Sequence, residues 1–285
     1  MTTLENATNS RRVRRRRYAN LRRAAAALSV LGLASCSQST KQLRLRDETD
    51  FARQHDPATA PRSKGHWVTV GDSRAYLAIP PNVRPPMPGV LVLHTARGLT
   101  RDIQLWTDRL SEEGYGALAV DFYHGRSSDN LEEAKALRDE ANKHPDENHA
   151  MLRRAFDLLA TDPRIQARRR ALVGWSYGAA WGTHLASQWS DVDAVVAYYG
   201  AADPAPQNVA KIGAQVLLIC GAQDGEAEDV VAFEASLRSA GKTFRVLWND
   251  EGHNFADPSN PRYASRAADT AYREVRHFLD LTLRE

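Results

Sequence analysis

The stretch Ala171-Leu-Val-Gly-Trp-Ser-Tyr-Gly-Ala-Ala180 decides the fold. It opens with a short apolar run, which is typical of a strand buried on both faces of a sheet. It ends in a helical pattern rich in small residues. Glycines at positions 174 and 178 allow a strand to turn sharply into a helix that packs closely against it. The stretch therefore predicts a strand–turn–helix unit inside an α/β architecture.

Strand and helix patterns alternate on both sides of this unit. Apolar or alternating runs predict further strands at residues 67–70, 75–79, 90–93, 117–120, 194–197, 216–219 and 244–247. Helical spacing occurs at residues 102–113, 131–160 in two pieces, 177–189, 227–240 and 262–282. The first two strands flank a turn and are expected to form a hairpin. The alternation predicts one doubly wound α/β domain with a mostly parallel sheet and helices on both faces.

Composition excludes several protein classes. The 285 residues are 42% hydrophobic and 26% charged, which excludes a collagen-like, low-complexity or wholly disordered chain. Eight arginines and one acid within residues 1–35 give +7, so the rest of the chain carries −4 of the total charge of +3. The body is therefore mildly acidic, and we expect no nucleic-acid partner. No metal-ligand cluster or dinucleotide fingerprint is evident in the sequence, so no cofactor is expected.

The N-terminus has the pattern of an export leader, predicted over residues 1–35. A basic segment precedes an apolar run at residues 24–34, which is too short to span a bilayer but suits a signal peptide. Leu33-Ala-Ser-Cys36 resembles the lipobox of bacterial lipoproteins, in which the cysteine is acylated and becomes the new N-terminus. A plain cleaved signal, or a basic arm with an incidental cysteine, are the alternatives.

The leader sets the expected organisation of the remaining chain. Residues 36–62 are polar and aperiodic and are predicted to be a flexible tether, followed by the α/β domain at 63–285. Acylation of Cys36 would anchor this domain to a membrane on the periplasmic side of a bacterial envelope.

Ser176 is the candidate nucleophile. In a strand–turn–helix setting, the central serine of Gly-x-Ser-x-Gly is exposed at the carboxyl edge of the sheet. The Tyr177 N–H, at the start of the helix, can donate to an oxyanion. The alternative is a glycine-rich turn with no chemistry.

A serine nucleophile needs a base and an orienting acid. Asp224 follows the strand predicted at 216–219, and His253 follows the one at 244–247. Both residues therefore fall on the same sheet edge as Ser176, which predicts a Ser-Asp-His triad. A helix-capping aspartate and a solvated turn histidine are the alternatives. Glu226 and Asp229 are the other candidate acids.

Five further blocks, together with the Gly-x-Ser-x-Gly turn, resemble the dienelactone hydrolase family of α/β-hydrolases. These blocks are Gly89–His94, Asp108–Tyr115, Ala117–Tyr123, Gly221–Asp224 and Gly252–Ala256. The resemblance covers about residues 66–283. It implies the α/β-hydrolase fold and cleavage of a small-molecule ester or lactone through an acyl-enzyme. It also implies that the backbone N–H of Ala96 is the second oxyanion donor.

The sequence departs from the family pattern at several positions. The best-known members carry a cysteine nucleophile and a glutamate after the first-block histidine, where this chain has Ser176 and Thr95. Family members bind a substrate carboxylate with two arginines. Here one is displaced to Arg126 and the other is replaced by Asp257, which would repel an anion. We therefore expect a neutral ester or another acyl substrate.

The predicted pocket-lining side chains are Thr95, Tyr123, Arg126 and Tyr199. Two other functions use the same features. One is an amidase or peptidase with the same triad, and the other is a non-catalytic binding protein of the cell envelope.

Overall fold

The computed structural model describes residues 64–201 and 203–284. The predicted leader and tether, and Cys36 with them, lie outside the described residues, so the boundaries between these segments stay predictions. Within the part of the chain that is described, no helix has the length and apolar character needed to cross a membrane.

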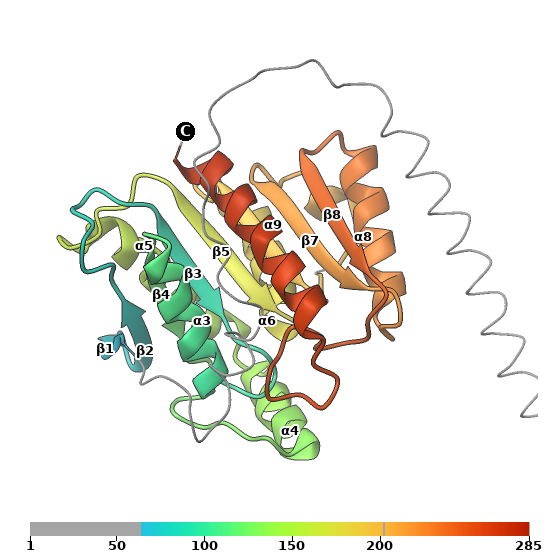
Figure 1. Cartoon of the computed structure of the whole chain (residues 1–285), viewed down its shortest axis with the longest axis horizontal. Helices are drawn as coiled ribbons and strands as arrows, with labels where there is room; N and C mark the ends of the chain where they lie inside the picture. Colours follow the sequence, from blue (N-terminus) through green and yellow to red (C-terminus); the bar gives the residue numbers. More distant parts are fainter. Residues whose placement is uncertain (1–63, 202, 285) are drawn as a thin grey trace, which may run out of the picture. The chain divides into compact units, whose positions relative to one another are not determined.

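An eight-stranded sheet forms the centre of the described chain, in the order β1-β2-β4-β3-β5-β6-β7-β8 (Figure 1). The strands are β1 (His66–Val70), β2 (Ser73–Ala78), β3 (Gly89–Leu93), β4 (Gly116–Val120), β5 (Arg170–Trp175), β6 (Ala194–Tyr198), β7 (Gln215–Gly221) and β8 (Phe244–Asn249). Strand β2 pairs antiparallel with β1 and β4, and the remaining pairs are parallel. Residues of β3, β4 and β6 are buried throughout, as their continuous apolar sequences predict.

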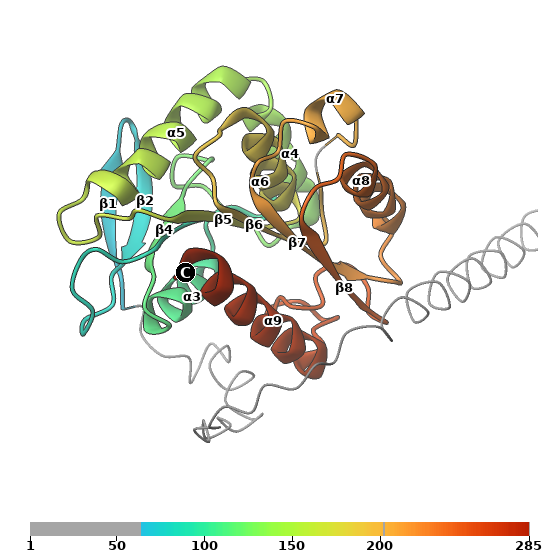
Figure 2. The ribbon, with the colours of Figure 1, turned by 90° about the horizontal axis from the view of Figure 1, so that it is seen from above.

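Helices cover both faces of the sheet (Figure 2). On one face lie α3 (Arg101–Glu112) and α9 (Ser265–Leu283). On the other lie α4 (Leu131–Ala141), α5 (Pro145–Thr161), α6 (Tyr177–Gln188), α7 (Pro206–Val209) and α8 (Ala227–Ser239). A separate apolar cluster fills the space between the sheet and each helical layer. The predicted doubly wound α/β class is confirmed.

The agreement extends to single elements. Every strand and helix expected within the described residues is present, and the hairpin joins β1 to β2. The short helix α7 was not predicted. The last helix begins at Ser265 rather than at residue 262. Because β3, β5, β7 and β8 run parallel, the loops that follow them meet at one edge of the sheet.

Candidate active site

Ser176 occupies the sharp turn between β5 and α6. Its backbone has φ of 51° and ψ of −111°, a region that a residue with a side chain rarely adopts. The Ser176 N–H donates to the Tyr198 carbonyl at 2.8 Å, and its carbonyl accepts from the Ala180 N–H at 3.0 Å. These bonds to β6 and α6 hold the strained turn in place.

The turn also depends on glycine for close approach. A Cβ atom on Gly178 would lie 2.1 Å from the Leu93 carbonyl oxygen at the end of β3. A Cβ atom on Gly200 would lie 2.6 Å from the carbonyl oxygen of Ser176 itself. Backbone atoms of the neighbouring elements therefore fill the space on both sides of Ser176. This packing constrains the direction of the Ser176 side chain.

The structure brings together the three side chains that were predicted as a triad. His253 Nε2 lies 3.0 Å from Ser176 Oγ, and His253 Nδ1 lies 2.8 Å from Asp224 Oδ2. Asp224 is 7% exposed, and its Oδ1 accepts from the Glu226 N–H at 2.9 Å. A carboxylate only accepts, so Nδ1 carries the proton and Nε2 is free to accept from the serine hydroxyl. Asp224, rather than Glu226 or Asp229, contacts the imidazole.

The electrostatic surroundings of His253 favour its protonated form. Burial lowers the pKa of the imidazole, but the hydrogen bond and charge of Asp224 act in the opposite direction, with help from the charge of Glu226. The net result is a pKa above the ordinary histidine value. The Tyr199 ring packs against the imidazole with centroids 5.1 Å apart and fixes its plane. This histidine is therefore a base that readily keeps the proton it accepts.

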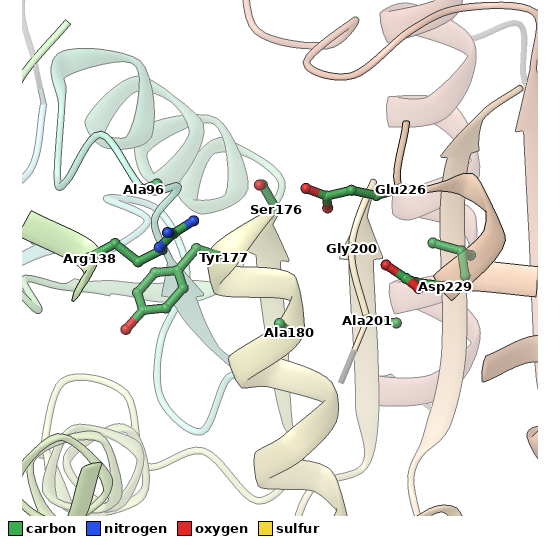
Figure 3. Close-up of a pocket in the computed structure, with 10 residues that line it drawn as sticks. Ala96, Arg138, Ser176, Tyr177, Ala180, Gly200, Ala201, Glu226 and Asp229 are labelled. Atoms are coloured by element: carbon green, nitrogen blue, oxygen red, sulfur yellow. The ribbon is translucent and has the colours of Figure 1, made fainter. Parts of the chain in front are cut away.

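The two predicted oxyanion donors lie beside Ser176. Ala96 and Tyr177 line the same pocket as the serine, on the same side of it (Figure 3). Among the described residues, neither backbone N–H has a hydrogen-bond acceptor. Two amides near a nucleophile and without protein acceptors are suited to an oxygen that gains negative charge.

His94 orders the loop that carries Ala96. The ring is fully buried, its Nδ1 lies 2.6 Å from the Thr95 carbonyl oxygen, and its Nε2 accepts from the Phe122 N–H at 3.0 Å. An acceptor at Nε2 requires the proton to be on Nδ1, which then donates to Thr95. Burial lowers the pKa of His94 to about 4, so the ring is neutral near pH 7.

The pocket has a volume of about 130 Å³ and is built from five parts of the chain. Its wall consists of Ala96, Arg138, Ser176, Tyr177, Ala180, Gly200, Ala201, Glu226, Asp229 and Val230. Arg138 comes from α4, and the two acids come from the start of α8. Arg138 was not predicted, because an arginine on an amphipathic surface helix has no sequence pattern that marks it as a pocket residue. The two acids were predicted as alternatives to Asp224 and not as pocket residues.

The four side chains predicted to line this pocket do not line it. Tyr123 is buried against His94 and Tyr177, because it packs inward from the end of β4. Arg126 is exposed, and its Nε donates to the Tyr123 carbonyl. Thr95 and Tyr199 instead line a separate cavity of about 20 Å³ beside the loop that carries Ala96.

The described residues include no group of three His, Cys, Asp or Glu side chains placed to hold a metal ion. The groups that meet at the pocket are the Ser176 hydroxyl, the His253 imidazole and the backbone N–H groups of Ala96 and Tyr177. This set is suited to acyl transfer.

Comparison with known proteins places this site in a family. The sequence model of the dienelactone hydrolase family matches residues 73–283. "Protein usf" of Aquifex pyrophilus is 30% identical over 132 residues, which are 45% of this chain and 56% of that protein. A protein of Aquifex aeolicus named "Putative carboxymethylenebutenolidase" is 27% identical over 156 residues, which are 53% of this chain and 66% of that protein. The chain thus spans less than two thirds of the length of either relative.

A solved structure with low sequence identity to this chain has the same fold. The protein m3DLH superposes with a TM-score of 0.69 at 23% identity, covering 77% of this chain and 98% of that one. The family match extends over strands β2 to β8, both helical layers and all three residues of the Ser176–His253–Asp224 arrangement. On this match, the chain belongs to the dienelactone hydrolase family.

Proposed function

We propose that the protein is a serine hydrolase that cleaves a carboxylic ester or lactone through an acyl-enzyme. The observation that carries the proposal is the chain of short contacts from Ser176 Oγ to His253 and on to Asp224, at 3.0 and 2.8 Å. Membership of a hydrolase family supports it.

The proposed reaction runs in two halves. His253 Nε2 takes the hydroxyl proton as Ser176 Oγ attacks the ester carbonyl, whose oxygen becomes an oxyanion beside the Ala96 and Tyr177 amides. The intermediate collapses, and the alcohol leaves with the proton from the imidazolium. A water molecule then gives its proton to His253 and attacks the acyl carbonyl. Release of the acid returns the proton to Ser176.

Each protein group has a separate role in this scheme. Asp224 holds the imidazole in the required tautomer and stabilises its positive charge. His94 keeps the loop of Ala96 in position through the Thr95 carbonyl. The strained backbone of Ser176 exposes the hydroxyl, and the surrounding backbone contacts maintain that strain.

The test is hydrolysis of p-nitrophenyl acetate and butyrate by the full chain and by its Ser176→Ala variant. We expect the variant to lose nearly all activity, whereas Ser187→Ala, a serine of the same helix outside the pocket, should retain it. Activity that survives in Ser176→Ala would refute the proposal. The matching p-nitroanilides distinguish an amidase or peptidase, for which amide hydrolysis would exceed ester hydrolysis.

We also propose that Cys36 carries a lipid anchor and that the domain faces the periplasm of a bacterial envelope. The support is the sequence of residues 24–36 alone. Mass spectrometry of the membrane-extracted protein should find an acylated N-terminal Cys36. A chain that keeps its unprocessed basic segment in the cytosol would contradict this proposal.

A further inference from the structure

The pocket wall beside Ser176 carries two acids for which no ion pair is found within the described part of the chain. Glu226 precedes α8 and Asp229 lies in its first turn, and both line the pocket. Figure 3 shows the Glu226 carboxylate turned toward Ser176. Among the described residues, neither carboxylate accepts a hydrogen bond or forms an ion pair. Partial burial raises the pKa of Glu226, and the charges of Asp224 and Asp229 act in the same direction, whereas those of His253 and Arg138 act against it.

The opposite wall does not neutralise these acids. Arg138 lies on the same side of Ser176 as Ala96 and Tyr177, across the pocket from Glu226 (Figure 3). Its Nε and Nη2 both donate to one oxygen of Asp139, at 3.0 and 2.8 Å. The charge of Arg138 is therefore largely matched within α4. Among the described residues that line the pocket, Glu226 and Asp229 are the charged side chains for which no ion pair is found, and both are negative.

The dipole of α8 explains why acidic residues occur at the start of this helix, but it does not explain why Glu226 and Asp229 line the pocket. Acids in the first turn of a helix interact favourably with its dipole, and Glu228 and Asp229 both fill that role in α8. Glu228 does so without lining the pocket. The dipole therefore does not account for the fact that both Glu226 and Asp229 line the pocket. The neighbouring cavity at the loop of Ala96 is bordered by two acids, Asp102 and Asp257, and by one cation, Arg97.

We propose that this pocket selects substrates that carry an ammonium group close to the scissile ester bond. The inference rests on the proposed serine hydrolase function and adds the substrate class. Glu226 and Asp229 are the specificity-determining residues, because each can approach a cation without first breaking a protein ion pair. An anionic substrate would be repelled by the same carboxylates.

The test uses two pairs of esters in which one quaternary nitrogen replaces one carbon at constant shape. Acetylcholine and 3,3-dimethylbutyl acetate place the charge on the alcohol side. The p-nitrophenyl esters of betaine and of 3,3-dimethylbutanoate place it on the acyl side. The quantity compared is the ratio of kcat/KM for the charged ester to that for the neutral ester, after subtraction of spontaneous hydrolysis. The charge of Glu226 also raises the pKa of His253. A change in that pKa affects both esters of a pair equally, so it cancels in the ratio.

The full chain is compared with Glu226→Gln, Asp229→Asn and the matched control Glu228→Gln, which removes the same charge from the same helix turn outside the pocket. We expect the wild-type ratio to favour the charged ester in at least one pair. Each pocket variant should lower that ratio about fivefold, and Glu228→Gln should not. Added KCl should lower the wild-type ratio toward those of Glu226→Gln and Asp229→Asn.

Two results would overturn the inference. One is a wild-type preference for the neutral ester in both pairs, and the other is an equal change of the ratio in Glu228→Gln. Ser176→Ala, measured on the same esters, separates this failure from failure of the proposed function. If hydrolysis requires Ser176 but kcat/KM is the same for the charged and the neutral ester, only the proposed substrate class is refuted. Hydrolysis that persists without Ser176 refutes both.

Discussion

The reacting side chains and the charged pocket wall are fixed in different ways. Ser176, Asp224 and His253 follow parallel strands, and backbone contacts or short hydrogen bonds hold each of them. Arg138 lies on α4 and Glu226 immediately precedes α8, and both side chains line the pocket. Under the proposed function, the sheet edge supplies the reacting groups, whereas the side chains on the helices select the substrate. Changes at the sheet edge should therefore have large effects on every substrate, and changes on the wall should have small, selective effects.

The largest contrast should be between two neighbouring acids. Asp224→Asn is expected to lower kcat about 10⁴-fold on a neutral ester, because an asparagine favours the wrong imidazole tautomer. Glu226→Gln, two residues away, should change the same kcat less than about tenfold. Steady-state kinetics of the two variants on p-nitrophenyl butyrate make the comparison. A loss in Glu226→Gln as large as that in Asp224→Asn would mean that Glu226 is the orienting acid.

Gly178→Ala tests whether backbone packing holds the sheet edge. The new Cβ would lie 2.1 Å from the Leu93 carbonyl, so either α6 or β3 must shift. We expect a loss of about 3 kcal/mol in the free energy of unfolding, measured by urea denaturation. Gly213→Ala is the control, since a Cβ there meets no atom within 4 Å. Equal stability of the two variants would show that this close approach does not constrain the serine turn.

His94 should make stability depend on pH. Its pKa is about 4 when folded and near 6.5 when unfolded, so the unfolded chain binds more protons between these values. Stability from this group is therefore present above pH 6.5 and is lost as the pH falls toward 4. We expect a contribution of about 2–3 kcal/mol, measured as the difference between urea unfolding of the wild type and of His94→Gln at several pH values. Parallel pH curves for the two proteins would contradict this assignment.

A smaller effect is expected on the pH profile of activity. His253 must be neutral to accept the serine proton, and its pKa is raised above the usual value. The kcat/KM of the wild type should therefore rise with pH through a midpoint above 6.5. Glu226→Gln removes one charge that raises the pKa of His253 and should move the midpoint to lower pH. An unchanged midpoint would show that the charge of Glu226 does not affect the pKa of His253.

The smallest effect is expected at Arg138. Its guanidinium already binds Asp139, so Arg138→Gln should change kcat/KM for a neutral ester by less than about fivefold. A fall of several hundredfold in kcat would mean that Arg138 stabilises the oxyanion directly. Arg138 would then be one of the reacting side chains. The distinction between reacting groups at the sheet edge and substrate-selecting groups on the helices would no longer hold.

The same division explains what could be predicted from the sequence. Apolar runs identified the parallel strands, and the position of a residue after a strand was enough to bring Ser176, Asp224 and His253 to one edge. No equivalent rule places a helix side chain over a pocket. Arg138 reaches the site because the segment after β4 carries α4 to that edge, a tertiary arrangement with no local pattern.

The errors in the predicted pocket have a physical cause as well. Tyr123 and Tyr199 follow strand ends, which suggested that they face the site. Both rings are buried in aromatic clusters instead. Tyr199 has a positive φ of 39°, which alters the direction of its side chain relative to a regular strand end. Neither the burial of a large ring nor an unusual φ is visible in a single sequence.

The central claim is that Ser176 is a nucleophile activated by His253. A fluorophosphonate probe, which reacts with activated serines, tests this claim most directly when the labelled full chain is digested and mapped by mass spectrometry. We predict a single adduct on Ser176, no adduct in Ser176→Ala, and much slower labelling in Asp224→Asn. A folded wild-type protein that remains unlabelled, or an adduct on any other residue, would contradict the account.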